Sequence, residues 1–107
     1  MTVTKYRAKP TVIDGIRFAS KAEARRYSEL RLLQKAGKIT GLVCQPKVDC
    51  EVNGQKVCTY VADFWYVKAG SDDEVYEDVK GVRTPIYKLK KKLVKALHDI
   101  DVQEIRA

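Results

Sequence analysis

The amino-acid sequence predicts an α/β (α+β) domain: a mixed central sheet of about four to five strands, two flanking helices and an N-terminal hairpin. Helix-start signals at Ser20 and Thr84 each precede a segment with helical spacing of apolar residues. Apolar runs typical of strands lie between these segments and after the second one. Asp-Gly and Asn-Gly pairs separate some of the runs, as they do in tight hairpins. At 107 residues, we expect a single domain over residues 1–107.

Composition limits the classes of function. Lysine and arginine total 21 against 14 acidic residues, for a net charge of +7, and the isoelectric point is near 9.4. Such a surface suits a polyanion, because lysine and arginine contacts to phosphate dominate nucleic-acid affinity. No run approaches the roughly 20 apolar residues of a membrane span, and the N-terminus lacks an apolar signal-peptide core. We therefore expect a soluble, cytoplasmic protein with no membrane partner.

The chain begins with a basic arm and a small hairpin. Lys5, Arg7 and Lys9 surround Tyr6, and this arm is open to two interpretations, phosphate contact or a frayed, solvated terminus. The Asp14-Gly15 pair then lies between apolar residues and predicts a hairpin.

The first helix is predicted from Ser20 to Ala36, with Gly37 ending it. Ser20 and Glu23 fit a capping box, in which each side chain satisfies a backbone donor of the other residue. Glu23 also extends the apolar stripe of Tyr27 and Leu30, so an inward-pointing role stays open. The arginines predicted to face solvent or a ligand are Arg25, Arg26 and Arg31.

Residues 39–80 are predicted to form a meander of three or four mostly antiparallel strands. The Asn53-Gly54 turn would pair Cys50 with Val57, with Cys58 on the opposite face. Three cysteines without the short paired spacings of a zinc site indicate reduced, structural thiols. The run Tyr60–Val67 is apolar on both faces and predicts one central strand.

Acidic residues within these apolar runs indicate a metal site. Asp63 lies inside the run at 60–67, where a carboxylate is costly unless it is paired or binds a metal. In the next strand, Val75 to Lys80, Asp78 and Lys80 share a face because they are two residues apart. Mg²⁺ usually takes one or two protein carboxylates, which Asp63 and Asp78 would supply. The alternative is an exposed, salt-bridged strand edge.

The second helix starts at Thr84, with Pro85 in its first turn. An apolar stripe is predicted to face the core: Ile86, Leu89, Leu93 and Leu97. Another face is basic, and is either solvated or binds phosphate: Lys88, Lys91, Lys92 and Lys95. His98 at the helix end is expected to be structural. A final strand is predicted from Ile100 to Ile105.

Glu23, Asp63 and the Asp78-x-Lys80 pair, followed by a helix and a strand, resemble the PD-(D/E)xK nuclease superfamily, which includes restriction endonucleases and Holliday junction resolvases. The resemblance is closer to a small phage and prophage family of formerly unknown function within that superfamily. It spans Gly15 to Ile105 and rests on these segments: 15–27, Gln45-Pro46, 60–66 and 76–93. Ala62 departs from the proline in the superfamily's name, which weakens the signature rather than the chemistry.

The resemblance implies a restriction-endonuclease-like core and a Mg²⁺- or Mn²⁺-dependent endodeoxyribonuclease. Asp63, Asp78 and Glu23 would be the metal-binding acids, and Lys80 would stabilise charge on the phosphate. The basic residues expected to contact DNA are Lys5, Arg7, Lys9, Arg25, Arg26, Arg83, Lys88, Lys91, Lys92 and Lys95. A homodimer is expected, acting on branched DNA in phage or prophage recombination, replication or packaging within a bacterial host. Two alternatives stay open, a non-catalytic basic DNA-binding module and a phage structural or adaptor protein.

Overall fold

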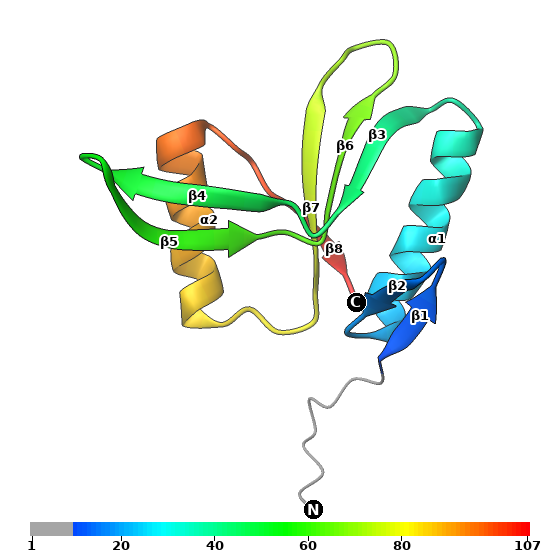
Figure 1. The fold of residues 1–107 in the computed structure, drawn as a ribbon, viewed down its shortest axis with the longest axis horizontal. Helices are drawn as coiled ribbons and strands as arrows, with labels where there is room; N and C mark the ends of the chain where they lie inside the picture. The colour runs from blue at the N-terminus through cyan, green and yellow to red at the C-terminus, as the bar shows by residue number, and fades with distance from the viewer. Residues whose placement is uncertain (1–9) are drawn as a thin grey trace, which may run out of the picture.

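A computed structural model describes residues 10–107, which form eight strands and two helices (Figure 1). In chain order these elements are β1 (Thr11–Ile13), β2 (Ile16–Phe18), α1 (Lys21–Lys35), β3 (Ile39–Cys44), β4 (Lys47–Val52), β5 (Gln55–Val61), β6 (Phe64–Lys68), β7 (Glu74–Lys80), α2 (Pro85–His98) and β8 (Gln103–Arg106). The predicted fold class is confirmed: the chain is α+β, with two helices, a mixed central sheet of four strands and an N-terminal hairpin. Among these described residues, neither helix is long and apolar enough to cross a membrane.

The central sheet has the strand order β3-β6-β7-β8. β3, β6 and β7 are antiparallel neighbours, whereas β8 runs parallel to β7. The predicted meander is wrong in its pairing, because β3 pairs with β6 and not with β4, the next strand in the chain. Two parallel neighbours need a long crossover connection, and α2 provides it. The register places Glu104 beside Asp78 and Arg106 beside Lys80.

The prediction of one continuous strand over Tyr60–Val67 is wrong. β5 ends at Val61 and β6 begins at Phe64, so Asp63 lies at a break between two strands. The segment that pairs with it, between β3 and β4, is interrupted at the same level. Gln45 adopts φ 57° there, and Pro46 has no N–H to donate to a strand ladder. Hydrogen bonds from Gln45 N to Asp63 O (2.9 Å) and from Ala62 N to Pro46 O (3.1 Å) bridge the two breaks. Residues 39–68 are therefore one long ribbon that bends sharply at Asp63 (Figure 1).

Beyond the bend, β4 and β5 form a separate two-stranded sheet instead of joining the central one. A register shift between Cys50 and Glu51 places Cys58 opposite Cys50, so the predicted Cys50–Val57 pairing is wrong. A β-bulge of this kind inserts an extra residue into one strand. All three cysteines are free thiols.

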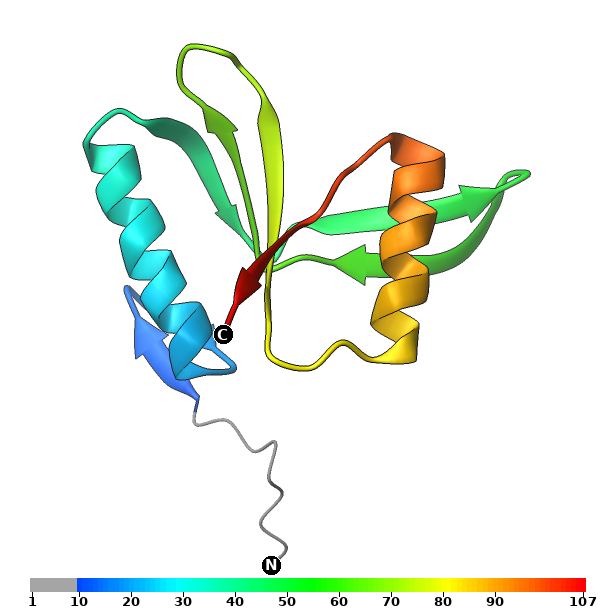
Figure 2. The same cartoon turned by 180° about the vertical axis from the view of Figure 1, so that it is seen from behind.

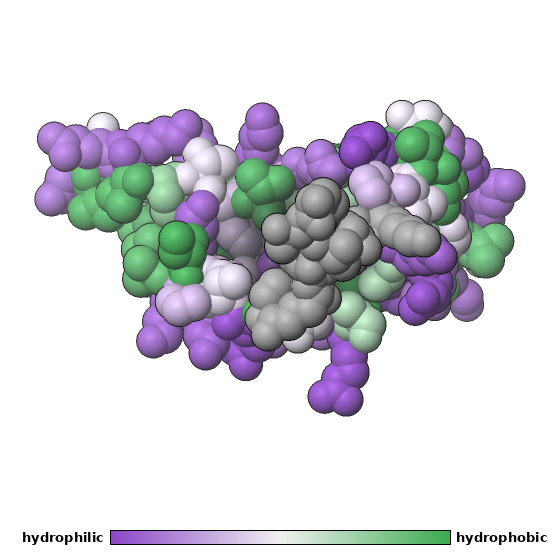
Figure 3. All heavy atoms as spheres, turned by 90° about the horizontal axis from the view of Figure 1, so that it is seen from below, coloured by the Kyte–Doolittle hydropathy of each residue, from purple (hydrophilic) through white to green (hydrophobic). Residues whose placement is uncertain are grey.

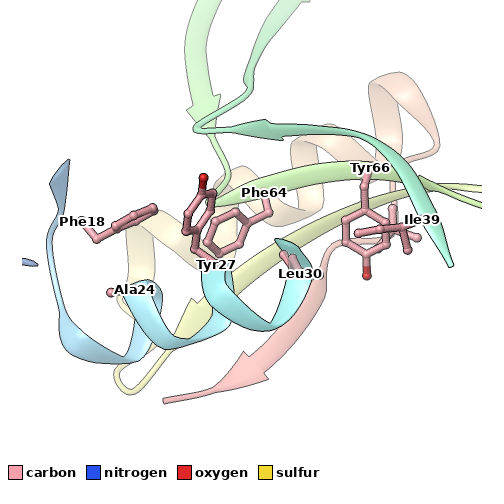
Figure 4. Close-up of a cluster of buried hydrophobic side chains, with 8 residues drawn as sticks. Phe18, Ala24, Tyr27, Leu30, Ile39, Phe64 and Tyr66 are labelled. Atoms are coloured by element: carbon pink, nitrogen blue, oxygen red, sulfur yellow. The ribbon is translucent and has the colours of Figure 1, made fainter. Parts of the chain in front are cut away.

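α1 packs against the central sheet around one hydrophobic cluster. Ser20 is the predicted N-cap, and its Oγ accepts a hydrogen bond from Glu23 N at 3.1 Å. The predicted inward face is confirmed, since Tyr27 and Leu30 are buried. Their aromatic and aliphatic partners come from β2, β3, β6 and β7, and most of them are labelled in Figure 4. The cluster contains Phe18, Ala24, Tyr27, Leu30, Ile39, Phe64, Tyr66 and Val75.

α2 covers the β4-β5 hairpin at the other end of the molecule (Figure 2). The prediction that the apolar stripe of α2 faces the core is wrong. Three residues of the stripe, Ile86, Leu89 and Leu97, are exposed, and Leu93 is half-buried. Tyr87 and Val94 occupy the buried face instead. Hydrophobic side chains accordingly gather on the surface of this half of the molecule, at the left of Figure 3.

Candidate active site

Asp63 is held against β7 by the bend of the ribbon. Its backbone N donates to Glu77 O at 3.0 Å, and its Oδ2 accepts a hydrogen bond from Val79 N at 2.6 Å. These two contacts flank Asp78 in the sequence, so they place the Asp63 carboxyl beside the Asp78 carboxyl. The sequence predicted this acid within a strand, but the bend gives it a turn-like position from which it faces β7.

Asp78 is almost completely buried, at 2% exposure, and both of its oxygens have partners. The Tyr60 hydroxyl donates to Oδ2, and the Lys80 ammonium lies 3.1 Å from Oδ1. The ion pair agrees with the strand alternation that predicted a shared face for Asp78 and Lys80. A buried carboxylate is stable here because a cation and a hydroxyl donor replace its water.

Lys80 is positioned by α2 as well as by Asp78. Its Nζ lies 4.2 Å from the centroid of the Tyr87 ring, within cation–π distance. The Tyr87 hydroxyl in turn donates to Glu104 Oε2 at 2.8 Å. Tyr60 and Tyr87 were not among the residues predicted for the site. Strand parity would have placed Tyr60 on the face opposite to Asp63, because the two are three residues apart, and nothing in the sequence indicated Tyr87.

Glu23 approaches the pair from the first turn of α1. The Ser20 hydroxyl lies 3.3 Å from its Oε2, so the capping serine contacts the carboxylate as well as the backbone. The predicted capping role is therefore present on the serine side. Glu23 is also near enough to Asp63 for its negative charge to act on that carboxyl.

Burial and neighbouring charge raise the pKa of Asp63 to about 7. Burial is the largest cause, and the charges of Asp78 and Glu23 add to it, while the hydrogen bond from Val79 N opposes it. Burial and the hydrogen bond to Asp78 likewise raise the pKa of Tyr60. Three carboxyl groups thus repel one another at this point, and a bound cation would relieve that repulsion.

The donor chemistry of Asp63 and Asp78 fits a hard divalent cation. Mg²⁺ favours carboxylate oxygens, usually takes one or two of them, and completes its coordination with water. Each carboxylate has about four lone-pair sites, so Asp78 keeps accepting capacity beside Tyr60 and Lys80. Within residues 10–107, no three acidic, histidine or cysteine side chains are arranged as a ready-made metal cluster.

On the opposite face of β7, Glu77 forms a second buried polar group that the sequence analysis did not identify. It is 1% exposed and accepts two hydrogen bonds from Arg26, at 2.8 Å to Oε1 and 2.6 Å to Oε2. The Tyr66 hydroxyl also donates to it, and burial together with this bond raises the pKa of Tyr66 to about 12. This network ties α1 to β7. Strand alternation alone could have indicated that Glu77 and Asp78 face opposite sides.

The residues predicted to contact DNA differ in their surroundings. Lys5, Arg7 and Lys9 lie outside the described residues. Arg26 forms an ion pair with Glu77, and Lys95 forms ion pairs with Asp99 and Asp101. Arg83 and Lys91 both contact Glu104, at 3.2 and 3.4 Å. Arg25, Lys88 and Lys92 are exposed and form no ion pair with any described residue.

Comparison with known proteins identifies the family of the chain but no activity. A family model described as "Protein of unknown function (DUF1064)" matches residues 3–106. No curated protein matches the chain.

Proposed function

The chain belongs to the DUF1064 family, and from the geometry of its candidate site we propose that it is a metal-dependent endodeoxyribonuclease that hydrolyses phosphodiester bonds. One observation carries the proposal. Asp63, from the bend of the ribbon, meets Asp78 and Lys80 of β7 in a half-buried site of two acids and one ammonium. Burial makes this combination costly for stability alone, which favours a catalytic role.

The order of the elements also supports the proposal. Glu23 lies on a first helix, Asp63 at the start of one strand, and Asp78 and Lys80 on the next, before a helix and a parallel strand. The resemblance to PD-(D/E)xK nucleases implies this order. Because the acids come from three separate elements, a chance cluster along one strand does not explain them.

The side chains have distinct roles in the proposed reaction. Asp63 and Asp78 would hold Mg²⁺ or Mn²⁺, with Glu23 adding negative charge at the edge of the site. When bound, the ion supplies Lewis-acid chemistry that polarises the phosphate and makes water a better nucleophile. Lys80 would donate to a non-bridging phosphate oxygen, where negative charge develops in the transition state. Tyr87 and Asp78 both contact the Lys80 ammonium and would orient it for that role.

The proposed substrate is branched DNA, such as a junction or a flap, in phage recombination, replication or packaging. Two-fold symmetry suits the cutting of two strands, so the active species would be a homodimer. This part of the proposal rests on the resemblance and on symmetry.

A cleavage panel tests the proposal. Purified protein is incubated with end-labelled duplex, four-way junction, flap and single-stranded DNA, each with Mg²⁺, Mn²⁺ or EDTA. Cutting that requires a divalent ion and favours a branched substrate is expected. Binding without cutting under either ion would overturn the nuclease and leave the non-catalytic DNA-binding module. Neither binding nor cutting would favour the structural or adaptor protein.

A further inference from the structure

A groove of about 470 Å³ lies between α2 and the segment leading into β8. Its volume is within the range of pockets that bind small ligands, roughly 300 to 1,000 Å³. The basic residues that line it are Arg83, Lys88, Lys91, Lys92 and Lys95. Ala96, Ile100 and Val102 give it an apolar floor, and the acidic residue among its described lining, Asp101, pairs with Lys95. We propose that this groove binds the phosphodiester backbone of a single nucleic-acid strand as that strand leaves the active site.

The cations of the groove are of two kinds, those that pair with an acidic side chain and those that do not. Lys95 is of the first kind and pairs with Asp99 and Asp101. Arg83 and Lys91 are held in place by Glu104. Because these side chains are already ordered in the free protein, ligand binding loses less conformational entropy. Lys88 and Lys92 are exposed and have no acidic partner within the described chain. Because they are four residues apart on one helix, they lie on the same face, about 6 Å apart along the helix axis. Two unpaired cations at this spacing are available to successive phosphates.

The groove connects to Lys80 through a chain of contacts. Lys80 lies over the Tyr87 ring, Tyr87 donates to Glu104, and Glu104 binds Arg83 and Lys91 at the wall of the groove. The register of β7 and β8 also places Glu104 beside Asp78, so both side chains lie on one side of the sheet. A strand whose phosphate lies at Lys80 can therefore continue into the groove.

A larger cavity, of about 1,130 Å³, does not suit this ligand. It lies between β4, β7 and the end of α2, and most of its ionisable lining is acidic, including Asp49, Glu51, Asp73, Glu74 and Asp99. Phosphates would be repelled there. Charge thus distinguishes the two cavities and favours the smaller one as the path of a strand.

The choice of nucleic acid as ligand rests on the proposed function, so the test separates binding from cleavage. A labelled single strand of about 20 nucleotides is titrated with protein in EDTA, and the affinity is followed by fluorescence anisotropy across about 50 to 200 mM salt. The test variant is Lys88→Gln/Lys92→Gln. The matched control is Lys35→Gln/Lys38→Gln, which removes one lysine in the last turn of α1 and one just after it. Both are exposed and form no ion pair within residues 10–107. Circular dichroism checks that both variants fold.

The test variant is expected to bind the single strand at least about tenfold more weakly than wild type at 100 mM salt. Its plot of log affinity against log salt should be shallower by about 1.4, since each lost phosphate contact removes about 0.7. The control should lose less than about threefold. Equal losses in the two variants, or no binding of the single strand by wild type, would overturn the groove assignment. Loss of binding in a protein that never cleaves DNA would uphold the groove while rejecting the nuclease.

Discussion

At the scale of single residues, Asp63 is the group most changed by its surroundings. Its carboxyl has an ordinary pKa of 3.8 and a pKa of about 7 in the folded protein. Between about pH 4 and 7, the folded state therefore holds a proton that the unfolded state has lost. This proton stabilises the fold below pH 4, and the stabilisation disappears as the pH rises toward 7.

We therefore predict a pH effect on the metal-free protein. In EDTA, the free energy of unfolding should fall between pH 5 and pH 8, and Asp63→Asn should remove most of this fall. At pH 8 the variant should be more stable than wild type by about 2 kcal/mol, after allowance for solvent screening. Urea unfolding at both pH values measures it, with exposed Asp73→Asn as control. The same pH dependence in wild type and Asp63→Asn would contradict the raised pKa.

Tyr60 gives a second prediction, because its hydroxyl donates to the buried Asp78 carboxylate. Tyr60→Phe should lower the free energy of unfolding by about 1 to 3 kcal/mol, the range for hydrogen bonds to charged groups. It should also slow metal-dependent cleavage, because Asp78 would be less firmly oriented. Tyr76→Phe is the matched control, as Tyr76 is half-buried and makes no hydrogen bond within residues 10–107 through its hydroxyl. Equal stability of the two variants would show that the Tyr60 contact contributes little.

Some of the contacts in the candidate site were predictable from the sequence. Alternation along a strand predicted that Asp78 and Lys80 share a face, and the ion pair confirms their proximity. The contribution of Tyr87 was not predictable, because α2 brings it to Lys80 from a separate part of the fold. Such a contact depends on how a helix is rotated about its axis, which short-range patterns specify poorly.

At the scale of elements, the Arg26–Glu77 pair joins α1, which carries Glu23, to β7, which holds Asp63 through Val79 N. Arg26→Met should destabilise the protein by about 3 kcal/mol, because it leaves the buried Glu77 without its cation. The double variant Arg26→Met/Glu77→Gln should recover much of that loss. Chemical denaturation of both variants completes a double-mutant cycle with Glu77→Gln. Additive effects, or an equal loss in exposed Arg25→Met, would contradict the coupling.

The rotation of α2 gives a further prediction. Val94 is completely buried and Leu89 is 59% exposed, although the sequence pattern predicted the reverse for Leu89. Val94→Ala should cost about 2 kcal/mol of stability, while Leu89→Ala should change it by less than about 0.5 kcal/mol. Thermal or urea unfolding distinguishes them. A larger loss for Leu89→Ala would restore the predicted stripe as the buried face.

The elements themselves were mostly predictable, because caps and turns are local. Ser20, Thr84 and the Asn53-Gly54 pair have the roles that the sequence predicted. The bend at Asp63 was not, since the apolar run at 60–67 continues through it without a glycine or a proline. The strand ladder is interrupted there by Gln45 and Pro46, on the segment that pairs with this run. The residues around Asp63 therefore do not indicate this break, because it is caused by residues on the segment that pairs with them.

At the scale of the whole molecule, the bent ribbon divides the fold into two hydrophobic clusters. One lies beneath α1 and the central sheet, and the other beneath α2 and the β4-β5 hairpin. The candidate site lies between them, where the ribbon bends toward β7 (Figure 1). The sequence predicted the class of the fold and its two helices, but not this division, because it depends on which strands pair. The arrangement accounts for the meeting of acids from three elements.

The most direct test is the rate at which Asp78→Asn cleaves DNA. Single-turnover cleavage of a labelled substrate cut by wild type is compared in saturating Mg²⁺ for wild type, Asp78→Asn and the control Asp72→Asn. Asp72 is exposed and has φ 60°, a conformation that asparagine also tolerates, so the control should cut normally. We predict that Asp78→Asn cuts at least about 1,000-fold more slowly, which is a barrier higher by roughly 4 kcal/mol, while binding the DNA in EDTA as wild type does. Cleavage by folded Asp78→Asn at the wild-type rate would contradict the proposed active site.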